Sequence, residues 1–77
     1  MASVSYDSEA DALYVTLGDG PSVRTDELGD GRMIDYDSAG VMIGFELIGV
    51  SHREINLDGV PRADEIAAAL RAIPHPV

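Results

Sequence analysis

The segment that most restricts the fold runs from Val41 to Ile48, VMIGFELI, because it is apolar along both sides of an extended chain. Alternate residues of a strand point to opposite faces of the sheet. One face is expected to carry Val41, Ile43, Phe45 and Leu47, and the other Met42, Gly44, Glu46 and Ile48. One helix can cover only one of these faces, so the second needs a partner. The segment therefore predicts a homodimer or a binding surface for another protein.

Other segments rich in strand formers precede it. They are Ser3–Tyr6, Ala12–Leu17, Ser22–Leu28, which is the most polar of them, and Arg32–Tyr36. Between the first two, DSEAD is expected to form a single helical turn capped by Asp7, whose carboxylate can accept from the amides ahead of it. The tetrapeptide 37–40, DSAG, is typical of a type I turn that closes on a glycine at positive φ. It predicts a hairpin between the last two strands.

The last part of the chain changes to helical spacing. Ile66, Leu70 and Ile73 fall at i, i+4 and i+7, which places them on one face of a helix. We expect this helix over residues 62–73 and a frayed tail over residues 74–77. Strands followed by one helix predict an α+β fold, with a small antiparallel sheet of about four to five strands and the C-terminal helix packed on one face.

The length of the chain limits its core. It has 77 residues and no cysteine, so neither a large buried core nor a disulfide is available to stabilise it. We expect residues 1–77 to form a single domain that gains stability by self-association. No apolar run approaches the ~20 residues of a membrane span, and the N-terminus lacks the features of a secretion signal. We therefore expect a cytoplasmic protein.

The charge of the chain narrows the class of partner. Fourteen acidic residues oppose five arginines, giving a formal net charge of −9. Such a chain repels nucleic-acid phosphates and anionic membranes, so neither is expected as a direct partner. The same charge would speed its encounter with a small basic protein.

The segment from Asp35 to Glu46, DYDSAGVMIGFE, matches the spelling of an EF-hand calcium loop. Calcium binding there requires flanking helices and six or more oxygen ligands. The flanks are instead strand sequence, and an extended VMIGF carries Glu46 some ~20 Å from the turn, at about 3.3 Å per residue. Only Asp35 and Asp37 then remain close. We expect a hairpin and no metal site.

A second acidic cluster consists of Asp7, Glu9 and Asp11. Acid–base chemistry would need these carboxylates in a desolvated pocket. Ser51 and His52 are adjacent, so in extended chain their side chains point apart and do not form a nucleophile–base pair. Two lone histidines, the second in the tail, do not make a zinc site. We expect no catalytic residue and no cofactor.

Two longer motifs carry a family resemblance. YDSEADALYVTL at 6–17 resembles the opening motif of the YuzE-like family of small bacterial proteins of unknown function, and DYDSAGVMIGFEL at 35–47 resembles its hairpin and following strand. The resemblance covers residues 4 to about 50. It implies a small, dimeric, bacterial and cytosolic α+β domain without an established activity. It also implies an antitoxin-like role, since some relatives look like partners of small basic toxins.

Two hypotheses of different classes follow. The first is a non-enzymatic interaction module, either a homodimer or an antitoxin-like subunit that binds a basic partner. Its expected contact residues are Glu9, Asp11, Asp26, Glu27 and Asp30 for electrostatics, with Met42 and Ile48 for apolar contact. The second is a small-ligand-binding protein or minor enzyme, which would use the cluster at residues 7–11 with Asp35, Asp37 or His52. That hypothesis requires a concave pocket in which at least two of these side chains meet.

Overall fold

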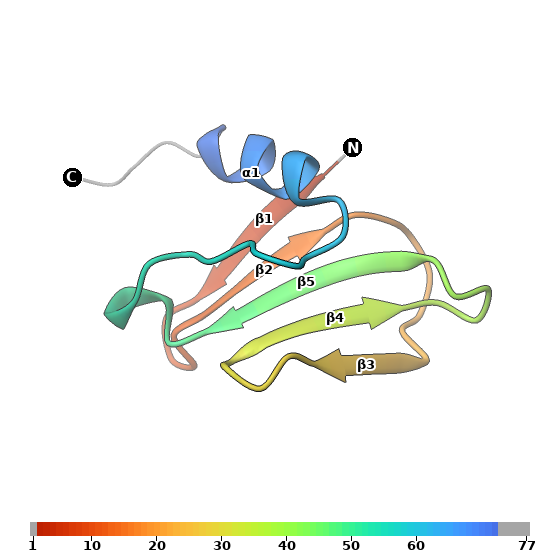
Figure 1. Cartoon of the computed structure of the whole chain (residues 1–77), viewed down its shortest axis with the longest axis horizontal. Helices are drawn as coiled ribbons and strands as arrows, with labels where there is room; N and C mark the ends of the chain where they lie inside the picture. Colours follow the sequence, from red (N-terminus) through yellow and green to blue (C-terminus); the bar gives the residue numbers. More distant parts are fainter. Residues whose placement is uncertain (1, 73–77) are drawn as a thin grey trace.

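The computed structural model describes residues 2–72 and confirms the α+β architecture (Figure 1). Within this range the elements are β1 (Ser3–Asp7), β2 (Ala12–Thr16), β3 (Arg24–Glu27), β4 (Arg32–Tyr36), β5 (Met42–Ile48), the 3-10 helix η1 (Val50–His52) and α1 (Ala63–Arg71). The predicted strands all form, and the bounds predicted for β4 match. The predictions for Ile73, for His75 and for the tail 74–77 lie outside the described residues.

The five strands form one antiparallel sheet in the order β1-β2-β5-β4-β3. The segment that is apolar on both sides becomes β5, the middle strand, which pairs with β2 along one edge and with β4 along the other. A strand in this place has neighbours that shield both of its edges. Its composition therefore fits the most protected place in the sheet.

One face of the sheet carries the core. Val15, Phe45 and Ile34 lie opposite one another on adjacent strands and are fully or almost fully buried. Ile66 of α1 packs into the same cluster and is fully buried, as its helical spacing predicted. The linker from η1 to α1 adds Val60 to the cluster and runs back on the same side of the sheet (Figure 1). Helix and linker together thus cover the core face.

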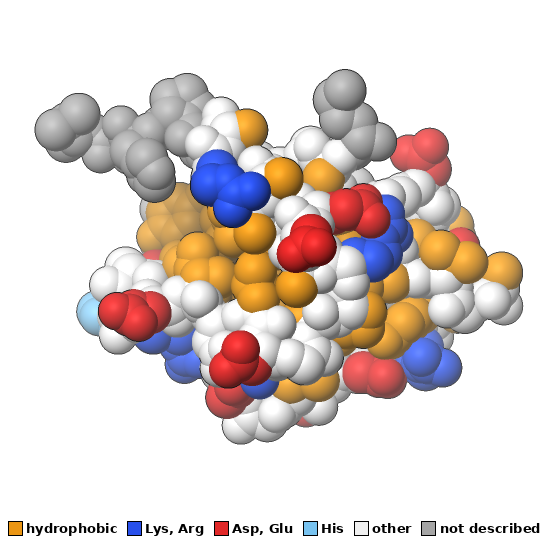
Figure 2. Space-filling view, turned by 45° about the horizontal axis from the view of Figure 1, so that its top comes forward, with side chains coloured by type: hydrophobic (Ala, Val, Ile, Leu, Met, Phe, Trp, Pro, Cys, Tyr) orange, Lys and Arg blue, Asp and Glu red, His pale blue; other side chains and the backbone are white. Residues whose placement is uncertain are grey.

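Figure 2 shows this side of the molecule, where hydrophobic side chains gather beside and beneath α1. The partly buried side chains that pack against the core include Val50, Leu57, Ala69 and Leu70. Arg62 fixes the start of the helix, because its Nη1 donates to the Met42 carbonyl at 2.9 Å. The helix begins one residue later than predicted, since Arg62 itself takes a left-handed conformation, with φ 59°.

The predicted face of Met42 is wrong. Its side chain is only 5% exposed and belongs to the core cluster, instead of sharing the opposite face with Gly44 and Ile48. The register explains the error: Gly44 lies opposite Asp35, but Met42 lies opposite the next residue, Tyr36. A shift of this kind inserts one extra residue into a strand, and the alternation of faces changes there.

The two predicted turns form at their expected places. The Asp7 carboxylate accepts hydrogen bonds from the amides of Glu9 at 3.0 Å and Ala10 at 3.4 Å, although residues 8–11 form a turn without helix. Gly40 has φ 80°, and the Asp37 carboxylate accepts from the amides of Ala39 and Val41, each at 2.9 Å. The segment that matches the EF-hand consensus therefore forms the β4–β5 hairpin, as predicted.

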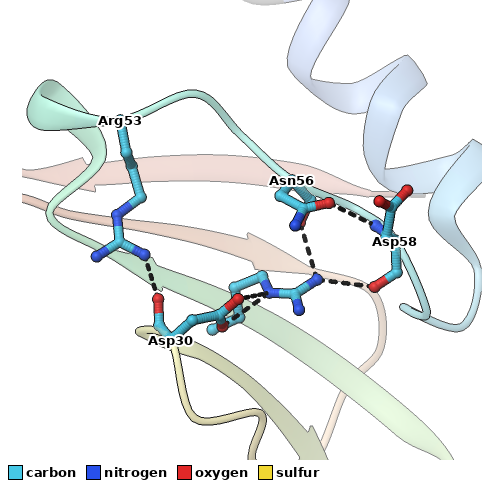
Figure 3. A network of polar contacts seen from close by, with 5 residues as sticks. Asp30, Arg53, Asn56 and Asp58 are labelled. Carbon is cyan, nitrogen blue, oxygen red and sulfur yellow. Dashed lines mark hydrogen bonds and ion pairs between the residues drawn. The ribbon is translucent and has the colours of Figure 1, made fainter.

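A polar network holds the linker onto the sheet (Figure 3). The Arg32 side chain is only 11% exposed; its Nε donates to both carboxylate oxygens of Asp30, at 2.9 and 3.0 Å. Its Nη1 donates to the carbonyls of Asn56 at 3.1 Å and Asp58 at 2.8 Å. Arg53 donates to the Asp30 carbonyl. One guanidinium on β4 thus fixes the linker that leads to α1.

Candidate functional site

The face of the sheet opposite the core has no helix or linker of residues 2–72 packed on it, and we call it the open face. The strand registers place on it Ser3, Ser5, Asp7, Ala12, Tyr14, Thr16, Thr25, Glu27, Met33, Asp35, Gly44, Glu46 and Ile48. Its side chains are polar along β1 and β3, whereas Ile48 of β5 is apolar and 41% exposed. The face is therefore of mixed polarity.

A hydrogen-bonded line crosses the open face from β2 to β3. The Tyr14 hydroxyl donates to one Asp35 oxygen at 2.8 Å, and the Thr25 hydroxyl donates to the other at 2.5 Å. The Tyr14 ring reaches Asp35 by lying directly over Gly44, where a Cβ would be only 1.9 Å from the tyrosine oxygen. Burial, reinforced by the Asp35 carboxylate, raises the pKa of Tyr14 to about 12. Asp35 therefore has a structural role.

The open face is anionic. It carries four carboxylates, and within residues 2–72 every arginine lies elsewhere. Arg24 stacks on the Tyr36 ring at 4.2 Å to the centroid and pairs with Asp26. Arg62 forms two hydrogen bonds with Glu65, at 2.8 and 2.7 Å. Since Arg32 and Arg53 bond to Asp30 and Arg71 lies on α1, the negative charge of this face is not offset.

A hollow of about 310 Å³ lies where the β3–β4 turn meets the end of β5. Its lining is Glu27, Gly29, Gly31, Arg32, Met33 and Ile48. Glu27, Met33 and Ile48 belong to the open face, whereas Arg32 points to the core face, so the hollow reaches the open face at the end of the sheet. A second hollow of about 300 Å³ lies beside α1 and is lined by Ala2, Glu65, Ala68 and Ala69.

Asp11 is the centre of a separate cluster at the end of the β1–β2 hairpin. It accepts from the Tyr6 hydroxyl at 2.8 Å and from the Ser51 hydroxyl at 2.7 Å, and the Ser51 amide also donates to it. The hydrogen bonds from Ser51, and then that from Tyr6, lower the pKa of the Asp11 carboxyl. Its own carbonyl accepts from the amides of Gly49 and Val50. Asp11 thereby joins the hairpin to η1.

The Asp11 cluster does not have the arrangement of a catalytic triad. The Ser51 hydroxyl donates to Asp11 and not to His52, so no base is placed to activate it. The His52 Nε2 lies 4.0 Å from the same carboxylate, and its side chain is 86% exposed. Asp35 and Asp37, which the ligand hypothesis also named, lie in the open face and in the β4–β5 turn. Neither hollow includes a residue of this cluster.

The predicted contact residues do not form one patch. Asp11, Asp26 and Asp30 bond within the chain, to Ser51, Arg24 and Arg32 respectively. Glu9 lies exposed in the β1–β2 turn. Glu27 and Ile48 are the two that the structure brings together, at the hollow. The sequence did not lead us to expect Met33 or Tyr14 as contact residues. The alternation within Arg32–Tyr36 indicates the face on which Met33 lies, but its position beside Ile48 depends on the strand register.

Within the described range no three carboxylate or histidine side chains gather where they could hold a metal ion. Nor does that range include a helix with the length and apolarity needed to cross a bilayer.

Comparison with known proteins gives the family and no activity. A profile for a protein family of unknown function, DUF2283, matches residues 3–51. The chain belongs to the DUF2283 family. The DUF2283 match spans all five strands and ends within η1, so the linker and α1 lie outside it. Searches of curated proteins and of solved structures each found no significant match. The YuzE-like name stays a prediction.

Proposed function

We propose that this chain is a protein-interaction module that binds a basic protein partner through its open face. The observation that carries the proposal is an exposed sheet face with four carboxylates and no arginine from residues 2–72. Complementary charge steers such a partner toward the face and fixes its orientation. The hollow beside Ile48 supplies the apolar contact that a stable interface needs.

Association of two copies through this same face is disfavoured. A two-fold interface would place the face against itself, and like charges would then oppose one another. The net charge of −9 on each copy adds to this repulsion. A homodimer, which the sequence also favours, would therefore use another surface and leave the open face free for the partner.

The resemblance to the YuzE-like family supports a narrower form of the proposal, in which the partner is a small basic toxin and this chain is its antitoxin. The ligand-binding alternative has weaker support, because the hydrogen bonds of Asp11 are already made within the chain.

Affinity capture from a lysate of the source cells tests the proposal when variants show whether capture depends on the open face. The wild-type chain is compared with a Glu27→Gln/Glu46→Gln variant, which neutralises that face. A matched control, Asp19→Asn/Glu54→Gln, removes the same charge at exposed positions outside it. We expect one basic protein in stoichiometric amount with the wild type and the control, and little with the face variant. Equal capture by all of them would contradict the proposal.

A further inference from the structure

We infer that the hollow on the open face receives an arginine side chain of the protein partner. This inference rests on the proposed function and names the anchoring contact. Small-molecule sites occupy roughly 300–1,000 Å³, so a hollow of about 310 Å³ is at the lower limit for a ligand. A space of this size, open to solvent, suits one inserted side chain.

The lining has two parts of different character. Met33 and Ile48 provide an apolar wall, and Glu27 provides a carboxylate beside it. Glu27 and Glu46 lie opposite Met33 on the two neighbouring strands, so carboxylates flank the apolar wall on both sides. A side chain with an aliphatic stem and a cationic end matches this arrangement, because the stem can cover Met33 while the cation meets a carboxylate.

The positive charge of Arg32, which also lines the hollow, does not oppose a second cation. Its guanidinium is held by the Asp30 carboxylate and by two linker carbonyls. Glu27, in contrast, forms no ion pair with any residue in the range 2–72. Arg53 brings one positive charge beside Gly31, where its guanidinium donates to the Asp30 carbonyl. Glu27 and Glu46, which flank Met33, form no ion pair in that range, so the net unpaired charge beside the apolar wall is negative and a cation from a partner can neutralise it.

Arginine fits these groups better than lysine. Its planar guanidinium can donate two parallel hydrogen bonds to a carboxylate and is more weakly hydrated than an ammonium group. It therefore loses less hydration when it enters a partly apolar hollow. Arginine is also enriched among the residues that dominate binding energy at protein interfaces. The inferred occupant is one arginine of a basic protein.

Chemical-shift mapping of the full chain with small probes tests this inference without the partner. N-butylguanidinium carries the guanidinium group of arginine on a four-carbon stem that corresponds to Cα through Cδ. Guanidinium alone lacks the stem, N-butylurea lacks the charge, and n-butylammonium represents lysine. We expect N-butylguanidinium to produce saturable shifts centred on the amides of Gly29, Gly31, Met33 and Ile48, with at least several-fold weaker binding of the other probes.

Variants decide whether these shifts come from the hollow. Glu27→Gln removes its carboxylate, and Ile48→Thr removes apolar surface while keeping a β-branched residue in the strand. Each should weaken the N-butylguanidinium shifts several-fold, whereas Glu54→Gln should leave them unchanged. Shifts spread over all acidic residues, equal shifts from guanidinium alone, equal binding of n-butylammonium, or indifference to Ile48→Thr would each overturn the inference.

The two proposals can fail separately. If the probe does not enter the hollow but partner capture still depends on Glu27 and Glu46, only the arginine anchor is wrong. If the probe enters the hollow but no basic protein is captured through the open face, the proposed function fails while the hollow keeps its measured preference.

Discussion

Gly44 is the residue at which the account of the open face can be tested most sharply by mutation. A Cβ at this position would lie 1.9 Å from the Tyr14 hydroxyl oxygen and 2.5 Å from the ring carbon that bears it. These separations are too short to persist, so Gly44→Ala must displace the ring. The displaced ring can no longer donate to Asp35, and the line across the open face is broken.

The expected cost follows from two opposing contributions. A hydrogen bond to a charged group contributes about 1.5–3 kcal/mol to stability. Replacing a strand glycine by alanine returns about 0.5–1 kcal/mol, because glycine loses more backbone entropy on folding. The net loss should be about 0.5–2.5 kcal/mol, and each kcal/mol corresponds to roughly 4–8 °C in Tm for a domain of this size.

A double-mutant cycle, with the free energy of unfolding measured in urea, isolates the contribution of the clash between the Tyr14 ring and a Cβ at residue 44. With Tyr14→Ala already present there is no ring over residue 44, so Gly44→Ala should stabilise the chain by about 0.5–1 kcal/mol. Tyr14→Phe is the matched control, since it keeps the ring over Gly44 and removes only the hydroxyl; Gly44→Ala should remain unfavourable in that background. The same destabilisation with and without the Tyr14 ring would refute the reasoning.

Three further outcomes are expected. The pKa of Tyr14 is raised from its usual 10.0 to about 12, because the folded chain favours the protonated hydroxyl. The contribution of Tyr14 to stability is therefore complete below pH 10 and is lost as the pH rises through about 12. The chain has no lysine to titrate in this range, so ultraviolet difference spectroscopy can follow the tyrosines, and Asp35→Asn should lower the highest of their pKa values; an unchanged titration would contradict this. Asp11 has a folded pKa below its usual 3.8, so its contribution is complete above that value and is lost as the pH falls through the folded pKa. The free energy of unfolding, measured with urea at a series of acidic pH values, should therefore fall less steeply with decreasing pH for Asp11→Asn than for the wild type. An identical pH dependence would exclude this role. Arg62→Ala should speed hydrogen exchange in α1 more than in β2 and β5, because the helix start loses its bond to β5; uniform acceleration would show that Arg62 does not act locally.

The strands could be predicted because the residues that favour them lie within each segment. β4 (Arg32–Tyr36) has its predicted bounds, whereas β3 shrinks at both ends to Arg24–Glu27, and the apolar residues that flank it, Val23 and Leu28, stay exposed. The face of Met42 could not be predicted, since the extra residue in β5 arises from pairing with β4. Alternation read from a single strand contains no information about its partner's register.

The roles of the acidic residues divide in a similar way. Glu27 and Ile48 were predicted as contact residues and both line the hollow. Asp11 bonds to Ser51, which lies 40 positions away, and the Asp30 carbonyl bonds to Arg53, which lies 23 positions away. Such pairs depend on how the linker returns across the sheet, and no local pattern in the sequence indicates it.

The most direct test of the central claim is the calorimetric affinity of the captured basic protein for wild-type chain, the Glu27→Gln/Glu46→Gln variant and the Asp19→Asn/Glu54→Gln control. The account predicts that the face variant binds at least about tenfold more weakly, a loss of about 1.4 kcal/mol. Its affinity should also depend less on salt, and the control should match the wild type. Equal affinities for the face variant and the control would contradict binding through the open face.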